Sequence, residues 1–291
     1  MGKTDVPGND PPTRLMAASI CLMPGSVVGR LLEMREGIFR FNSRMGLRTA
    51  LLYTGGWFVQ WHEGPASAVD KTLEMSRSHR THSHLRVIHR SVGAGCLAEP
   101  LQIATLHGQD KPTDVARRLF RIEEERRGRG ELDPAEIWLR LSAPLAGPMA
   151  MVASAKVPAR LLAVTSESTE SIDLLKAIAE RCRVPVAYQR FATGGVRSID
   201  AGAAYADLGC SAAHTRIHAL SRHVLANSLM LLSLRQVHGV LILHGSAGHS
   251  HAASRAEAVG RFVARFRNPP RVHAVPAGRG CVEALLDLIA G

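Results

Sequence analysis

The stretch FNSRMGLRTALLYTGGWFVQWHEGPASAV, residues 41–69, decides the fold of the first half of this chain. Apolar segments flank Gly55-Gly56, and two glycines between such segments are typical of the tight turn of a β-hairpin. A helix is expected to end at Gly46 before the hairpin, and Pro65 opens another helix after it. With the apolar runs on either side, the order is β-α-β-β-α-β, which predicts a ferredoxin-like domain over residues 14–108.

The rest of the chain divides into three further parts. Residues 1–13 are polar and Pro-rich, which predicts a disordered leader. Residues 109–157 are predicted to form a helical extension and a linker, the helices covering the open face of the first sheet. Residues 158–291 alternate apolar strands with amphipathic helices, which predicts a doubly wound α/β domain with a mostly parallel sheet. The fold class of the whole chain is α/β, with an α+β N-terminal domain.

The composition excludes several classes of protein. The chain has 291 residues and a formal net charge of +11, and 46% of its residues are hydrophobic, enough for folded cores. Aromatic residues make up only 4%, which argues against a stacking platform for single-stranded nucleic acid. No apolar run is long enough to cross a bilayer, and the leader resembles neither a signal peptide nor an anchor. We therefore expect a cytoplasmic protein without membrane contact.

The cysteines and histidines predict no metal site. The five cysteines are far apart and form no CxxC pair, so neither a disulfide framework nor a zinc-finger site is expected. Residues 79–89 hold four histidines, but neither cysteine nor carboxylate lies near them to complete a ligand set. A solvated, mildly basic surface is the preferred interpretation of this cluster.

The helix end and the hairpin resemble the BLUF family of flavin-based blue-light sensors. The residues that carry this resemblance are Asn42, Gly46, Leu47, Tyr53, Phe58, Gln60, Glu63 and Gly64, followed by His82. The resemblance covers about residues 14–108 and implies a ferredoxin-like fold with FAD held between its two helices. It implies Asn42, Gln60 and His82 as the cofactor-binding residues. A structural role for Gln60 and Asn42 on the hairpin and the helix is the alternative.

The chain departs from the family pattern where the photochemistry is carried. In that family a Tyr on the first strand bonds the Gln and supplies an electron and a proton to the excited flavin. Here the matching position is Ala17 or Ala18, depending on register, and Arg48-Thr49 replaces a Thr-Gly pair. The resemblance therefore implies a degenerate module, which either binds flavin without the standard light response or binds none.

The second domain is similar, in the order and spacing of its segments, to the Ras-like small GTPases. The loop at 165–171, in the place of their phosphate loop, holds neither Gly nor Lys and carries two carboxylates, which would repel a triphosphate. Pro276-Ala277-Gly278-Arg279 stands in the place of the guanine-reading sequence. We predict a pseudo-GTPase, or a generic α/β domain, that binds no nucleoside triphosphate and serves as a docking surface.

Together these features predict a sensory or regulatory protein that acts through protein partners, a second copy of the chain among them. No enzyme activity is expected, because neither domain retains a recognisable reaction centre. The alternatives are a basic regulator that binds nucleic acid, for which no recognition motif is present, and a protein-interaction scaffold without flavin.

Overall fold

The computed structural model describes residues 11–290, except for 109, 131, 146–159, 167, 195–200, 211–212, 236, 245–259, 261–263, 265–269 and 279. Its strands are β1 (Thr13–Cys21), β2 (Arg48–Thr54), β3 (Trp57–Gly64), β4 (His82–Val92), β5 (Leu101–His107), β6 (Arg160–Ser166), β7 (Val186–Thr193), β8 (Ala201–Cys210), β9 (Ala213–Ser221), β10 (Gly239–His244) and β11 (Arg271–Pro276). Its helices are α1 (Val27–Met45), α2 (Ala66–Ser78), α3 (Pro112–Arg129), α4 (Pro134–Ser142), α6 (Glu170–Cys182), η1 (Arg222–Ala226), α7 (Ser228–Ser233) and α9 (Cys281–Ala290). Most of the predicted leader and linker lies outside the described residues.

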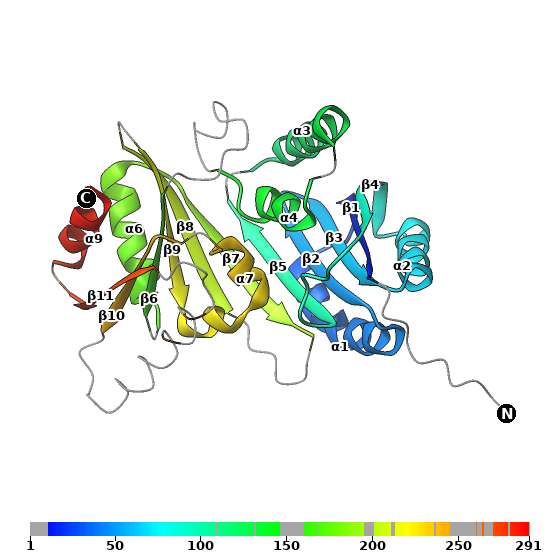
Figure 1. The fold of residues 1–291 in the computed structure, drawn as a ribbon, viewed down its shortest axis with the longest axis horizontal. Helices are drawn as coiled ribbons and strands as arrows, with labels where there is room; N and C mark the ends of the chain where they lie inside the picture. The colour runs from blue at the N-terminus through cyan, green and yellow to red at the C-terminus, as the bar shows by residue number, and fades with distance from the viewer. Residues whose placement is uncertain are drawn as a thin grey trace.

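The described strands form one continuous sheet, in the order β11-β10-β6-β9-β8-β7-β5-β2-β3-β1-β4 (Figure 1). The two halves of the sheet meet where β5 pairs antiparallel with β7, from Gln102 opposite Thr193 to His107 opposite Tyr188. An unpaired β5 would expose a row of backbone N–H and C=O groups, and β7 satisfies them. The two predicted domains therefore share a sheet in addition to following one another along the chain.

The first half has the predicted ferredoxin-like order, with the two strands predicted after the second helix, at 85–88 and 100–106, observed as β4 and β5. Ser26 caps α1 by accepting a hydrogen bond from the Gly29 N–H at 3.2 Å, and Gly46 ends the helix in the left-handed conformation, with φ of 65°. Gly55 and Gly56 also have positive φ, 49° and 78°, as the tight turn between β2 and β3 requires. β2 and β5 run parallel, and the neighbouring pairs are antiparallel.

The second half differs from the prediction in two respects. Its sheet is parallel from β11 through β10 and β6 to β9, but β8 and β7 are antiparallel to their neighbours, so it is mixed instead of mostly parallel. The strand β8, AGAAYADLGC, was not predicted, because Ala and Gly have low strand propensity. Backbone hydrogen bonds with β7 and β9 on either side stabilise this strand despite the low propensity of its residues.

Residues 223–236, whose apolar pattern predicts one amphipathic helix, are divided at Asn227 into η1 and α7. The Asn227 side chain accepts from the N–H groups of Leu229 and Met230, at 3.0 and 3.3 Å, and starts α7 as a new helix after η1. Asn is more favourable at a helix start than within a helix, which explains why the helical pattern is interrupted there. A further amphipathic pattern over residues 254–267, which also predicts a helix, falls mostly outside the described residues.

Helices cover both faces of the sheet. On one face, α1 and α2 pack on the first half, while α6 and α9 pack on the second. On the other face, α3, α4, η1 and α7 contribute to one apolar core that runs beneath both halves, and Figure 1 shows α4 and α7 lying over the sheet. Trp138 of α4 packs on Trp61 of β3, with ring centroids 6.0 Å apart. The prediction that the helices after the first domain cover its open sheet face is confirmed by these contacts.

A buried ion pair fastens the end of α4 to the second half. The Arg216 guanidinium makes two hydrogen bonds with the Asp207 carboxylate, at 2.7 and 2.9 Å, and both side chains are buried. The same guanidinium donates to the carbonyls of Ala143 and Pro144, at 2.6 and 3.0 Å. The Tyr205 hydroxyl donates to the Pro144 carbonyl at 2.8 Å. The bidentate geometry explains how a charged pair is accommodated in the core.

Candidate functional site

The sheet face beneath α1 and α2 is built from three rows of cross-strand neighbours. Residues paired across β1, β3 and β2 point to the same face, because side chains alternate along each strand and line up across it. The register gives the rows Ser19–Phe58–Tyr53, Ala17–Gln60–Leu51 and Leu15–His62–Thr49. The middle row places an amide between small and apolar side chains, which makes Gln60 the polar centre of this face.

The register decides which alanine stands where the BLUF pattern has its Tyr. Ala17 lies directly opposite Gln60, and it belongs to the cluster packed against α2. Ala18 lies opposite Val59 and belongs to the core on the other face. A side chain at position 17 can therefore meet Gln60, whereas one at position 18 cannot. The sequence had left the two positions open.

Gln60 takes part in a buried polar network. Its amide oxygen Oε1 accepts from His62 Nε2 at 3.2 Å and from the Ser76 hydroxyl of α2 at 3.0 Å. His62 Nδ1 lies 3.0 Å from the Thr49 hydroxyl. Burial lowers the pKa of His62 from 6.5 to about 4, because water no longer stabilises the imidazolium. His62 is therefore neutral near pH 7 and can donate from one nitrogen while accepting at the other.

Asn42 lies at one end of this face and is connected to the same network. Its side-chain Nδ2 donates to the Pro100 carbonyl at 2.7 Å, and Asn42 is 1% exposed. The backbone N–H of Thr49 donates to the same carbonyl at 3.1 Å. A series of hydrogen bonds thus leads from Asn42 through Thr49 and His62 to Gln60.

His82 belongs to a different row of the same face. Its Nδ1 lies 2.8 Å from the Ser19 hydroxyl, and its ring centroid is 5.3 Å from that of Phe58. Burial lowers the pKa of His82, and the neighbouring His79 contributes in the same direction. Of the three predicted cofactor-binding residues, Asn42 and Gln60 are linked by hydrogen bonds, while His82 is joined to the row of Ser19.

The Glu63-Gly64 pair at the end of β3 has a local structural role. Glu63 Oε2 accepts from the N–H groups of Cys96 and Leu97, at 2.8 and 2.9 Å. Burial raises the pKa of Glu63, although these two hydrogen bonds and nearby arginines act against that shift. A Cβ at Gly64 would lie 2.8 Å from the carbonyl oxygen of Gly46, so only glycine fits this approach. Glu63 therefore holds the loop after β4 in place, and Gly64 allows the end of α1 to approach β3 closely.

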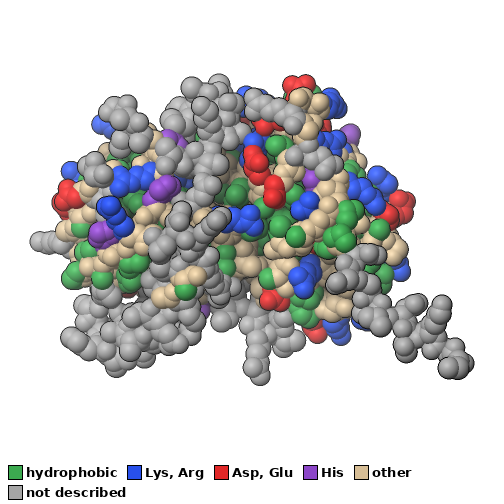
Figure 2. Space-filling view, in the orientation of Figure 1, with side chains coloured by type: hydrophobic (Ala, Val, Ile, Leu, Met, Phe, Trp, Pro, Cys, Tyr) green, Lys and Arg blue, Asp and Glu red, His purple; other side chains and the backbone are tan. Residues whose placement is uncertain are grey.

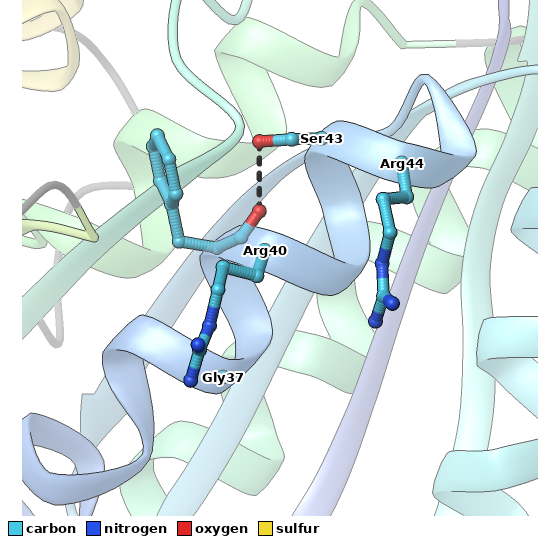
Figure 3. A pocket seen from close by; sticks show the side chains of 5 residues that line it. Gly37, Arg40, Ser43 and Arg44 are labelled. Atoms are coloured by element: carbon cyan, nitrogen blue, oxygen red, sulfur yellow. Dashed lines mark hydrogen bonds between the residues drawn. The ribbon is translucent and has the colours of Figure 1, made fainter.

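The surface outside this face carries no further predicted site residue. A pocket of about 480 Å³ lies on α1, and its described lining consists of Gly37, Phe39, Arg40, Ser43 and Arg44 (Figure 3). Arg40 is well exposed, and the Ser43 hydroxyl donates to the Phe39 carbonyl of its own helix at 2.8 Å. On the face shown in Figure 2, Lys and Arg side chains are scattered instead of gathered in one patch. Neither feature matches the predicted cofactor residues.

Sequence reasoning missed His62, Thr49 and Ser76 as members of the site. His62 follows Gln60 by two residues on a strand, and this spacing alone places both on one face. Thr49 was noted only as a departure from the family pattern, and Ser76 is brought in by the packing of α2. Within the described ranges, no group of three or more His, Cys, Asp and Glu side chains is arranged to hold a metal ion.

Comparisons with known proteins place the N-terminal part in a family. Residues 19–94 match the family model of BLUF, described as sensors of blue-light using FAD. The solved structures that resemble the chain include BlrB, a BLUF protein in its dark state, at 23% identity over 49% of this chain and 91% of that one, with a TM-score of 0.32. They also include the BlsA ground state, at 17% identity over 38% and 71% with a TM-score of 0.31, and BlrP1 of Klebsiella pneumoniae, at 21% identity over 32% and 24% with a TM-score of 0.28. No curated protein matches the chain.

The match identifies residues 19–94 as a BLUF domain, a family of flavin-binding sensors. The matched residues end before β5. The predicted resemblance of residues 158–291 to Ras-like GTPases gains no support from these comparisons. Among the helices of the described residues, none is both long and apolar enough to cross a membrane.

Proposed function

We propose that this chain is a BLUF-type sensory or regulatory protein that binds FAD between α1 and α2 and lacks the standard tyrosine-dependent photocycle. The single observation that carries the proposal is the pairing of Ala17 with Gln60 inside a domain that matches the BLUF family. The amide that the family uses is present, and the phenol that would accompany it is replaced by a methyl group.

The residues of the site fit a flavin in the chemistry of their donor set. Asn42 and Gln60 are two buried amides, and an amide both donates and accepts, as the mixed N–H and carbonyl edge of an isoalloxazine requires. The hydrogen bonds of Gln60 to His62 and Ser76 use its oxygen, and neither engages its NH₂ group. When bound, the flavin would supply a chromophore for blue light. Asn42 and Gln60 would hold it, with His82 at the Ser19 row of the same face.

The second half is proposed to transmit or receive a signal through protein contacts, without enzyme activity of its own. Support for this role comes from the β5–β7 pairing, which makes the second half a direct continuation of the sheet that carries Gln60. A displacement of β2 or β5 next to the site would be passed to β7 through backbone hydrogen bonds. A docking role of residues 158–291 agrees with the poor match of its loops to nucleotide chemistry.

The test is a visible spectrum of the full chain, purified in the presence of FAD, before and after blue light. We expect a bound flavin band in the wild type without the reversible red shift of a working BLUF sensor. Ala17→Tyr should restore a light-induced shift, because the phenol would stand opposite Gln60. Ala18→Tyr, its matched control on the other face of the sheet, should restore none. A reversible shift in the wild type, or the absence of bound flavin, would refute the proposal.

A further inference from the structure

His62 is buried on β3 with both ring nitrogens engaged. Nδ1 lies 3.0 Å from the Thr49 hydroxyl, and Nε2 lies 3.2 Å from the amide oxygen of Gln60. A neutral imidazole has one donor nitrogen and one acceptor nitrogen. The two hydrogen bonds of His62 must therefore run in the same direction along the network.

The amide oxygen of Gln60 sets that direction. It can only accept, so the proton of His62 resides on Nε2 and Nδ1 accepts from the Thr49 hydroxyl. The Ser76 hydroxyl donates to the same oxygen at 3.0 Å. If the amide rotated by 180° while His62 kept this tautomer, its NH₂ group would face the Nε2–H of His62, donor against donor. The network therefore couples the orientation of the Gln60 amide to the tautomer of His62.

We propose that His62 is a positioning residue that fixes the orientation of the Gln60 amide. With the oxygen held by His62 and Ser76, the NH₂ group is the part of Gln60 that meets a ligand between α1 and α2. The identity of that ligand as a flavin rests on the proposed function, but the orientation of the amide is a property of the protein alone. The two statements can therefore fail separately.

The experiment is nitrogen-15 NMR of the full chain, with and without FAD. In the wild type we expect His62 as the neutral tautomer protonated on Nε2, and one pair of side-chain amide resonances for Gln60. His62→Leu replaces the imidazole with an apolar side chain of comparable size and so removes the Nε2–H donor. It should produce a second pair of Gln60 resonances, because the amide oxygen is then no longer held by His62.

The matched control is His89→Leu. His89 is equally buried, but it lies opposite Met16, whose side chain belongs to the core on the other face of the sheet. The Gln60 resonances should not change in this variant. Thr49→Val keeps the branched shape and removes the hydroxyl that contacts Nδ1 of His62. It should populate the Nδ1-protonated form of His62 together with the second Gln60 pair, and it carries the test if His62→Leu does not fold.

The outcomes separate the two claims. A wild-type His62 protonated on Nδ1, or Gln60 resonances that stay unchanged in both His62→Leu and Thr49→Val, would overturn the positioning role whether or not FAD binds. Gln60 resonances that respond as expected in a chain that takes up no FAD would leave the positioning role intact and refute the proposed function. If FAD binds, its absorption maximum should shift in His62→Leu and stay in place in His89→Leu.

Discussion

Mild acid is expected to destabilise the folded chain, because two imidazoles are fully buried in it. Burial lowers the pKa of His62 from 6.5 to about 4, and burial together with the neighbouring Arg216 guanidinium lowers that of His218 to about 3. In the unfolded chain both rings bind a proton near pH 6.5. The unfolded state therefore takes up protons before the folded state does, and the free energy of unfolding must fall as the pH falls.

The magnitude follows from the two pKa values. The loss begins near pH 6.5 and continues to about pH 4 for His62 and to about pH 3 for His218. At pH 5 each imidazole should have removed about 2 kcal/mol from the free energy of unfolding, at about 1.4 kcal/mol for each unit of pKa difference. Well above pH 6.5 both imidazoles are neutral in the folded and the unfolded chain, so neither lowers the free energy of unfolding there.

The assay is urea unfolding at pH 7.5 and at pH 5, followed by tryptophan fluorescence. His62→Leu and His218→Leu should each reduce the pH-dependent loss by about 2 kcal/mol relative to the wild type, whatever their stability at pH 7.5. The matched control is His273→Gln on the exposed strand β11, which should leave the loss unchanged. If the buried-site variants lose as much free energy between the two pH values as the wild type does, the reasoning from burial is wrong.

Three further outcomes can be checked. Arg216→Met should lower the free energy of unfolding by about 3–5 kcal/mol in urea titrations, because it leaves the Asp207 carboxylate in the core without its guanidinium, and a change under 1 kcal/mol would contradict this. Gly194→Ala places a Cβ 2.6 Å from Cβ of Phe39 and should cost about 1–3 kcal/mol in the same assay, a loss that should shrink in a Phe39→Ala background. A chain ended after residue 145 leaves β5 without β7 and should aggregate in size-exclusion chromatography, whereas a stable monomer would mean that the β5–β7 pairing is dispensable.

Local signals in the first half predicted its fold well. The N-cap at Ser26, the left-handed Gly46 and the Gly55-Gly56 turn all act within a few residues, so the sequence contains the whole reason for each. The β8 strand shows the limit of such signals, because its Ala-rich sequence has little preference for a strand. Pairing with β7 and β9, the strands that precede and follow it along the chain, decides its conformation.

The candidate site was predicted in its parts but not in its connections. Asn42 and Gln60 were identified by resemblance, and the structure links them through Pro100, Thr49 and His62, of which sequence reasoning had assigned none to the site. Which residues share a face depends on strand register. Register is set by the pairing between strands, and a shift of one residue would move every side chain of a strand to the opposite face.

By itself, the sequence determined the elements of the first domain, the BLUF pattern from Asn42 to Gly64 and the lack of a Tyr on the first strand. These are properties of neighbouring residues, set by backbone propensity, side-chain period and the residue types present. Only the tertiary structure decided that Ala17, not Ala18, lies opposite Gln60, that His62 hydrogen-bonds the amide, and that β5 and β7 join the two halves into one sheet. Each of these depends on pairing between strands, which becomes defined when burial of one face selects a single register.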